Sequence, residues 1–344
     1  MLEKIPDLTQ SAGWLPLVFA LVMALAMLAY VILDGYDLGV GVLLQRADDE
    51  AQKDAMIASI GPFWDANETW LVLGVGILLV AFPAAHGVIL GALYLPVALM
   101  LVGLMLRGVS FDFRVKARDE HKRLWDRAFF GGSALAGWAQ GFMLGGLITG
   151  FKNDLVSNLF SALIGLCLLA AYCLLGAGWL IIKSEGALQL KAVGWALRSW
   201  GFTAAGVAAI SVATPLVSGR IFDKWFSFPN IVVLLPIPAM TLVLFYVMAR
   251  SLKRLPTRLA LNNQYGTAVP FACAVGVFLL SFYGLGYSLF PWLVIDRLTI
   301  WQAASSPEAL MVIFYGVAVV LPTIIAYTVY AYRVFRGKAF ALHY

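Results

Sequence analysis

Hydrophobic positions in this chain gather in long unbroken runs instead of alternating with polar positions. The runs begin near Trp14, Ile57, Val88, Ala128, Leu159, Gly201, Ile231, Thr267 and Ala309. Each run continues for about 18 to 28 residues, and about 20 apolar residues are enough to cross the hydrocarbon core of a bilayer as a helix. Backbone groups in lipid must be paired within their own segment. The pattern therefore predicts an all-α integral membrane protein with nine transmembrane helices.

The composition agrees with this fold class. Of the 344 residues, 62% are hydrophobic and only 12% are charged, whereas about 25% of residues are charged in an ordinary soluble domain. The connections between runs are short, so we expect a single membrane domain over residues 1–344. The net charge is +5 and shows no nucleic-acid footprint, so nucleic acid is not an expected partner. The long apolar runs make the lipid membrane an expected partner.

The distribution of basic residues predicts the orientation of the chain. If the N-terminus lies outside the cytoplasm, nineteen of the 24 Lys and Arg residues fall in cytoplasmic segments and five in outer ones. This is the positive-inside pattern, and it requires an odd number of spans. The first ten residues carry two acids and one lysine, unlike a signal peptide, so we expect the first run to be a retained helix. The C-terminus is predicted to be cytoplasmic.

Parts of the chain resemble one another at a long spacing. LAYVILDGYDLG in the first run resembles AAYCLLGAGWLI in the fifth, and LYLPVALMLV resembles VLLPIPAMTLV. The order suggests two four-helix bundles, approximately 14–150 and 158–290, with a peripheral ninth helix at 308–332. Parallel repeats of this kind occur in transporters. A proton-coupled secondary transporter therefore stays open as an alternative, as does a purely structural membrane partner.

Five ionisable side chains lie inside or at the border of the apolar runs: Asp34, Asp37, Asp65, Glu68 and Arg107. Charges at such depth are costly and are usually functional. All five are predicted to belong to the cytoplasmic half of the membrane or its border. Asp34 and Asp37 are three residues apart and share one helix face, as do Asp65 and Glu68.

These acids allow two interpretations. Two carboxylates close together in a low dielectric cannot both ionise cheaply, so one of them can hold or release a proton, which suits a relay. Alternatively, Arg107 neutralises Asp37 or Asp65 in a structural ion pair, and Asp34 and Asp37 lie in water at the interface. Asp65 is eight residues past Ile57, about 12 Å along a helix. We therefore expect Asp65 and Glu68 to lie deeper and favour the relay for them.

The histidines and cysteines indicate no metal site of the chain's own. His86, His121 and His343 all lie outside the middle of the runs, whereas a membrane haem most often needs a histidine ligand. Three cysteines lie inside apolar runs without CxxC spacing, which is typical of small core residues. By position alone, Trp64 and Trp70 on either side of the acidic pair would be packing residues.

Several segments match a known family in order along nearly the whole chain. They are LDGYDLGVGVL at Leu33 to Leu43, GPFWDANETW at Gly61 to Trp70, RGVSFDFR at Arg107 to Arg114, Phe290-Pro291, and LTIWQAASS at Leu298 to Ser306. Together they resemble subunit II of the cytochrome bd quinol oxidases. The first two segments are the most specific. The modest length and the short loops resemble the cyanide-insensitive branch.

The resemblance implies a function for the whole complex. Subunit II of this family has nine helices, in two four-helix bundles plus one peripheral helix, and pairs with a haem-bearing subunit I. That partner carries haem b, haem d and the quinol oxidation site, and the complex reduces oxygen to water with protons from the cytoplasm. The implied location is the bacterial inner membrane. A structural quinone and small accessory transmembrane subunits occur in some members.

The resemblance also assigns roles to residues of this sequence. Asp65 matches the acid on a proton route along the subunit interface, and Asp34 and Asp37 match the acids of the first helix. Trp70 matches a tryptophan near an apolar oxygen path. Glu68 departs from the Gln found at that position in some members, which puts its part in the relay in doubt.

Overall fold

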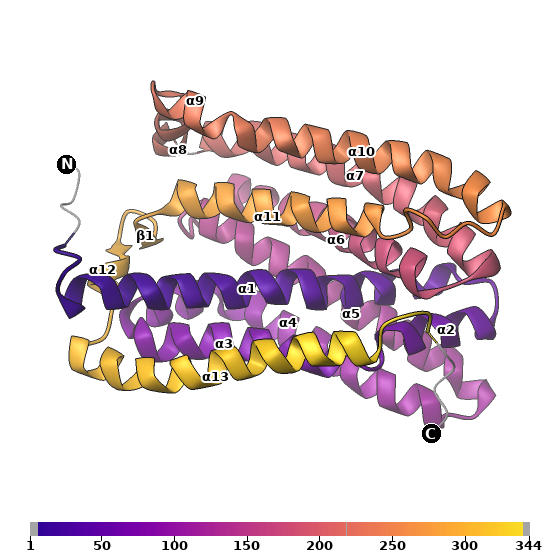
Figure 1. The fold of residues 1–344 in the computed structure, drawn as a ribbon. Coiled ribbons are helices and arrows are strands. Elements are labelled where there is room, and N and C mark those ends of the chain that lie inside the picture. The colour runs from indigo at the N-terminus through magenta and orange to yellow at the C-terminus, as the bar shows by residue number, and fades with distance from the viewer. Residues whose placement is uncertain (1–5, 218, 340–344) are drawn as a thin grey trace. The chain divides into compact units, whose positions relative to one another are not determined.

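The computed structural model describes residues 6–217 and 219–339, which form α-helices, one 3-10 turn and one short β-hairpin (Figure 1). The long helices are α1 (Ser11–Leu43), α3 (Trp64–Ala81), α4 (Pro83–Lys116), α5 (Asp119–Ile148), α6 (Leu155–Lys183), α7 (Gly186–Val217), α10 (Pro236–Ala260), α11 (Val269–Leu289) and α13 (Pro307–Val334). The short elements are η1 (Leu44–Arg46), α2 (Glu50–Ile60), α8 (Gly219–Phe226), α9 (Asn230–Leu234), β1 (Trp292–Val294), β2 (Leu298–Thr299) and α12 (Ile300–Ala303). His343 lies outside the described residues.

The chain groups into two compact units. Unit 1 combines Met1–Asp34, Pro62–Ala92 and Leu289–Arg336, and therefore contains most of α1, all of α3 and α13, and the β-hairpin. Unit 2 combines Gly35–Gly61, Leu93–Ser288 and Gly337–Tyr344, and therefore contains α2, most of α4 and all of α5 to α11. The arrangement into two four-helix bundles plus a ninth helix stays a prediction.

Eight helical segments of the described chain are long and apolar enough to cross a membrane: α1, α3, α4, α6, α7, α9 with α10, α11 and α13. The predicted all-α membrane fold is thus confirmed. Helix α5 is 30 residues long and covers the expected fourth span. It is not among the eight, because glycines and Gln140 dilute its apolar part. A count of nine crossings stays a prediction.

The second expected span begins later than the sequence suggested. The apolar run from Ile57 is broken: α2 ends at Ile60, a turn follows, and α3 begins at Trp64. The expected position of Asp65, 12 Å inside a helix, is therefore wrong, since Asp65 lies in the first turn of α3. Pro62 contributes to the break, because it has no N–H to continue the hydrogen-bond ladder of α2, and the backbone leaves helical geometry at the next residue, Phe63.

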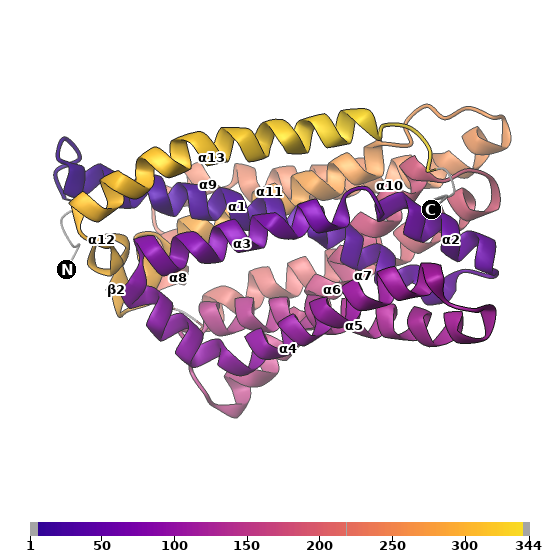
Figure 2. The same cartoon turned by 90° about the horizontal axis from the view of Figure 1, so that it is seen from below.

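Unit 1 is built on α1, α3 and α13, which run side by side in both views (Figures 1 and 2). At one end of the unit, the indole N–H of Trp301 in α12 donates to the carbonyl of Gly13 at 2.9 Å. The N–H of Ser305 donates to the carbonyl of Ala81 at the end of α3 at 2.8 Å. These bonds fix the connection that leads into α13.

Unit 2 depends on close contact between helix backbones. A Cβ added to Gly39 of α1 would lie 1.8 Å from the carbonyl oxygen of Tyr172 in α6, and one added to Gly176 would lie 2.5 Å from the backbone of Gly39. Gly141 of α5 is equally close to α6, since a Cβ added to Gly141 would lie 2.6 Å from the Cα atom of Gly165. Small residues at helix crossings let backbones approach closely, which favours association in lipid.

The end of α6 is capped by the C-terminal segment of unit 2. The N–H of Ala339 donates to the carbonyl of Lys183 at 2.8 Å. The ammonium of Lys338 donates to the carbonyl of Ser184 at 2.9 Å and to the amide oxygen of Gln264 at 3.2 Å. The last carbonyls of a helix lack partners within the helix, so this segment satisfies two acceptors at the end of α6.

Candidate functional site

The acidic stripe of α1 is fully buried. Tyr30, Asp34 and Asp37 are each at most 1% exposed, and Gly41 continues the same helix face against Ser133 of α5. Of the two interpretations made from sequence, a position in water at the interface is therefore wrong for both carboxylates. They are enclosed by the protein well before α1 ends at Leu43.

The acids of α3 are less buried than those of α1, the reverse of the expected order. Asp65 is exposed and Glu68 is half-buried. The reason is the turn before α3, which leaves Asp65 at the beginning of the helix instead of in its interior. An acidic side chain in the first turn interacts favourably with the positive end of the helix dipole.

Sequence reasoning missed Asn67, which connects the three helices of unit 1. Its side chain is 1% exposed. The Asn67 amide donates to the carbonyl of Leu33 in α1 at 3.3 Å, and the hydroxyl of Tyr332 in α13 donates to the amide oxygen of Asn67 at 3.2 Å. A polar residue between Asp65 and Glu68 in an apolar helix was the available clue. Asn67 positions the first turns of α3 against α1 and α13.

Trp70 lies in an apolar cluster one turn deeper along α3. It is 4% exposed and packs with Ala26 and Tyr30 of α1, while Leu321 and Ile324 of α13 close the cluster. Among the described residues, its indole N–H has no hydrogen-bond partner. Burying such a donor without a partner costs free energy. The surroundings of Trp70 are thus apolar, as an oxygen path requires, although the path itself stays a prediction.

Arg107 lies in α4 and is 1% exposed. The backbone there is close to α5, since a Cβ added to Gly132 would lie 2.8 Å from the backbone nitrogen of Arg107. Burial of a guanidinium in a membrane protein requires compensation by acceptors or a counter-charge. Its role as a structural ion pair stays a prediction.

A second charged group, which we call the Arg114 cluster, was also missed from sequence. It comprises Glu50, Lys53 and Asp54 of α2, Arg114 of α4 and Asp126 of α5. The Arg114 guanidinium donates to Asp126 and to Asp54, each at 2.5 Å, and to Glu50 at 3.1 Å. Both Arg114 and Asp126 are at most 3% exposed. The cluster joins three helices of unit 2.

Lys53 completes the Arg114 cluster. Its ammonium donates to Asp126 and to Glu50, each at 2.7 Å. Burial alone would lower the pKa of Lys53, but the hydrogen bonds to Asp126 and Glu50 outweigh it and raise that pKa above its ordinary value. Each charge in the cluster therefore has a partner within the chain.

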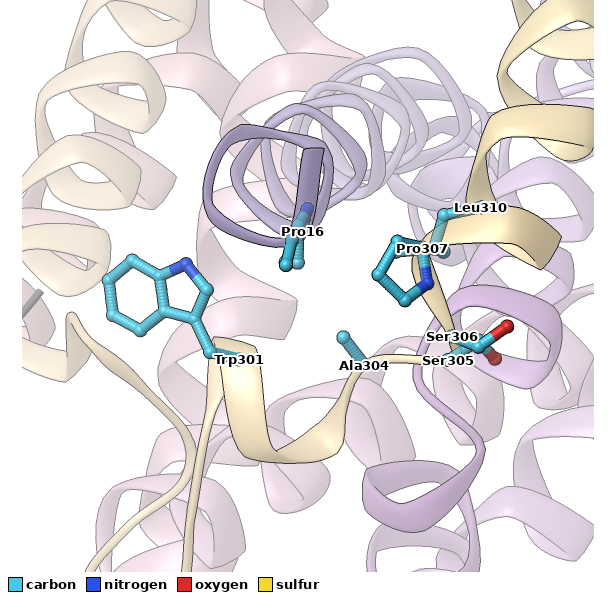
Figure 3. A pocket seen from close by; sticks show the side chains of 8 residues that line it. Pro16, Trp301, Ala304, Ser305, Ser306, Pro307 and Leu310 are labelled. Carbon is cyan, nitrogen blue, oxygen red and sulfur yellow. The ribbon is translucent and has the colours of Figure 1, made fainter. Parts of the chain in front are cut away.

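Two pockets of the described chain bear on whether a quinone fits it. One has a volume of about 270 Å³, and Figure 3 shows Trp301 facing Pro307 and Leu310 across it, with Pro16 of α1 between them. It is smaller than ligand sites of roughly 300–1,000 Å³. The other, about 420 Å³, is lined by charged side chains including Lys183, Glu185 and Lys338. Neither pocket suits an apolar quinone with a prenyl tail.

In the part of the chain that the structure describes, no group of three or more His, Cys, Asp or Glu side chains is placed to hold a metal ion. His86 is half-buried near the start of α4, and His121 is exposed near the start of α5.

Comparison with known proteins identifies the family. The chain is 26% identical over 337 residues to "Cytochrome bd ubiquinol oxidase subunit 2" of Bacillus subtilis, covering 92% of this chain and 95% of that protein. It is 24% identical over 365 residues to "Cytochrome bd-I ubiquinol oxidase subunit 2" of Escherichia coli K12, covering 92% and 93%. Its fold matches a chain of the bd oxidase from Geobacillus thermodenitrificans with a TM-score of 0.70 and 18% identity, over 94% of this chain and 99% of that one.

A family model agrees with these relatives. The model for cytochrome bd terminal oxidase subunit II matches residues 15–335, which include all of α3 and α13 and nearly all of α1. The resemblance seen in the sequence is thus confirmed, and this multi-pass membrane protein belongs to the cytochrome bd terminal oxidase subunit II family.

Proposed function

We propose that this chain is the haem-free subunit II of a quinol oxidase that reduces oxygen to water. It works beside a haem-bearing subunit I, which holds haem b, haem d and the quinol site. The family match over residues 15–335 supports the assignment, as do relatives named as ubiquinol oxidase subunits. The redox chemistry belongs to the partner. This chain supports the partner structurally and supplies a route for protons.

One observation carries the proton role. Asp65 is exposed on α3, an apolar helix that is one of the eight candidate spans. A carboxylate facing lipid is expensive, so in the assembled enzyme Asp65 meets water or a polar face of subunit I. Reduction of oxygen consumes protons, and Asp65 at that boundary receives them and passes them to the partner. Glu68, one turn along, has a supporting part.

The α1 acids have a different place in this scheme. Asp34 and Asp37 are fully buried, so a proton reaches them only through the protein. They hold charge or protons inside the subunit, and Arg107 balances the charge of Asp37. Trp70, in its apolar cluster of α1, α3 and α13, borders an oxygen path toward the partner.

The proposed topology follows the distribution of basic residues. The chain crosses the bacterial inner membrane nine times, with α5 as the fourth crossing, the N-terminus outside and the C-terminus in the cytoplasm. The start of α3, with Asp65 and Glu68, then lies toward the cytoplasm, where the protons originate. The structural quinone of this proposal lies at a surface completed by a partner, and small accessory subunits bind elsewhere on the complex.

The decisive experiment isolates the complex through an affinity tag on this chain and records its visible spectrum and quinol oxidase turnover. We expect haem b and haem d to co-purify. Asp65→Asn should lower turnover at least about tenfold, a barrier change of about 1.4 kcal/mol, with an unchanged haem spectrum. Asp223→Asn is the matched control, since Asp223 is an exposed acid of α8 outside the spans. A colourless protein, or full turnover in Asp65→Asn, would contradict the proposal.

A further inference from the structure

Helix α8 has one face fixed to the rest of unit 2. It lies at the turn that links α7 to α10 (Figure 1), and both of those helices are candidate membrane spans. Ile221 is 2% exposed. The indole N–H of Trp225, four residues later, donates to the hydroxyl of Ser288 in α11 at 2.8 Å. Ile221 and Trp225 therefore form the inner face of α8.

The outward side of α8 is unusually aromatic. Phe222 is 47% exposed and Phe226 is 53% exposed, with ring centroids 4.9 Å apart, and Phe228 just after the helix is 84% exposed. Exposed apolar residues continue along the chain on both sides, with Leu216 at 79% and Val233 at 70%. Apolar surface of this kind is unfavourable in water and marks contact with a membrane or a protein.

Cationic and aromatic groups beside these phenylalanines indicate that the contact is with the membrane and not with a protein. The ammonium of Lys224 lies 4.7 Å from the ring centroid of Tyr287, next to Trp225. Trp and Tyr concentrate at the level of lipid headgroups, and lysines there direct the ammonium toward the phosphates. Burial, and then the positive charge of Arg220, lowers the pKa of Lys224. A nearby lipid phosphate would counteract both effects.

We propose that α8 is an interfacial anchor that lies along the surface of the phospholipid bilayer. Phe222, Phe226 and Phe228 insert among the acyl chains just below the headgroups, and Lys224 contacts a lipid phosphate. Lipid is the occupant because α8 follows one candidate membrane span, Gly186–Leu216, and precedes the next, Asn230–Ala260. A short helix between two consecutive spans lies at the level where the chain leaves and re-enters the bilayer. Short helices with an aromatic face and a basic residue adopt this position. The anchor goes beyond the proposed function and does not depend on oxidase activity.

The test measures the depth of α8 in the purified complex reconstituted in phospholipid nanodiscs. Nitroxide labels are placed at Phe226→Cys and Phe228→Cys, and at Asp223→Cys as a control, after replacement of Cys167, Cys173 and Cys273 by alanine. Residue 228 is the safer site, since its side chain is largely exposed. Collision rates with oxygen and with a water-soluble nickel complex give the depth of each label.

We expect the labels at 226 and 228 to collide with oxygen and to be shielded from nickel, at about 5–10 Å below the phosphates. The label at 223 should be several-fold more accessible to nickel. Equal nickel accessibility at 223, 226 and 228 would overturn the proposal, because α8 would then lie in water. Shielding of 226 and 228 from both reagents would also overturn it, because a protein would then cover this face.

A second measurement uses the unmodified complex. Phospholipids that carry a photoreactive group close to the glycerol are incorporated into the nanodiscs, and the adducts are mapped by mass spectrometry. Adducts within residues 222–228 are expected. Adducts on α7 and α10 with none on that segment would contradict the proposal. This arm remains informative if a cysteine variant fails to assemble.

Discussion

The Arg114 cluster and the acids of α3 make opposite use of charge. In the cluster, Arg114, Lys53 and Asp126 have partners within the chain at 2.5 to 3.1 Å, and Arg114 and Asp126 are shielded from solvent. At the start of α3, a candidate membrane span, Asp65 is exposed, and none of the ion pairs among the described residues includes it. The first group is complete within the chain, whereas the partner that we propose for Asp65 lies outside it.

The comparison separates charges that hold the fold from charges that serve the complex. A buried charge that loses its partner is strongly destabilising, so changes in the Arg114 cluster should be measured as lost stability. Removing a charge whose partner belongs to another molecule should change the stability of its own subunit little. Changes at Asp65 should therefore be measured as lost turnover.

The largest expected effect comes from Arg114→Met. It leaves Asp126 buried without its guanidinium, and breaking a buried pair from one side costs about 3–5 kcal/mol. Thermal unfolding of the purified complex should show a lower midpoint and a lower yield. Arg123→Met on the exposed side of α5 is the control, and equal midpoints for the two variants would break the comparison.

The next prediction concerns stability in the variant that tests the proton route. Asp65→Asn should change the free energy of unfolding by no more than about 0.5 kcal/mol, as for most exposed sites, while turnover falls about tenfold. Thermal unfolding and oxygen consumption are measured on the same preparation. A parallel loss of both would place Asp65 among the charges that hold the fold.

Tyr332→Phe is expected to have a smaller effect. It removes the hydroxyl that donates to the buried amide of Asn67, and a net contribution of about 0.5–1.5 kcal/mol is typical of such a bond. Differential scanning fluorimetry should detect a modestly lower midpoint. Tyr330→Phe, on an exposed part of α13, should leave the midpoint unchanged, and identical shifts would refute the role given to Asn67.

The smallest effect is a pH dependence from Lys53. Because its pKa is raised in the folded protein, its stabilising contribution is complete below its ordinary pKa of 10.5 and is lost as the pH rises through the higher folded value. Unfolding midpoints of the parent and Lys53→Met should therefore differ at neutral pH, and the difference should shrink as the pH rises through the folded pKa of Lys53. A difference that grows with pH would have the wrong sign.

Sequence reasoning succeeded where the information is local. Runs of apolar residues located the long helices, and the spacing of Asp34 and Asp37 placed both on one face of α1. It failed at Asp65 because apolar residues continue through the turn at Gly61 to Phe63, so hydrophobicity alone did not show the break. Pro62 contained that information.

The Arg114 cluster could not be predicted from the sequence, for a different reason. Arg114 and Asp54 are 60 residues apart along the chain, and only the packing of α2, α4 and α5 brings them together. Asn67 could have been singled out as a polar residue in an apolar helix, but its partners Leu33 and Tyr332 belong to helices distant in sequence.

The contact of Gly39 with Gly176 has a consequence for biosynthesis. Helix α1 leaves the ribosome before α2 to α5, yet the surface that covers this glycine belongs to α6. During that interval, the insertion machinery or another protein must cover the small-residue face of α1 and its two carboxylates. Delayed delivery of α6 would leave α1 displayed to the proteases that remove unassembled membrane proteins.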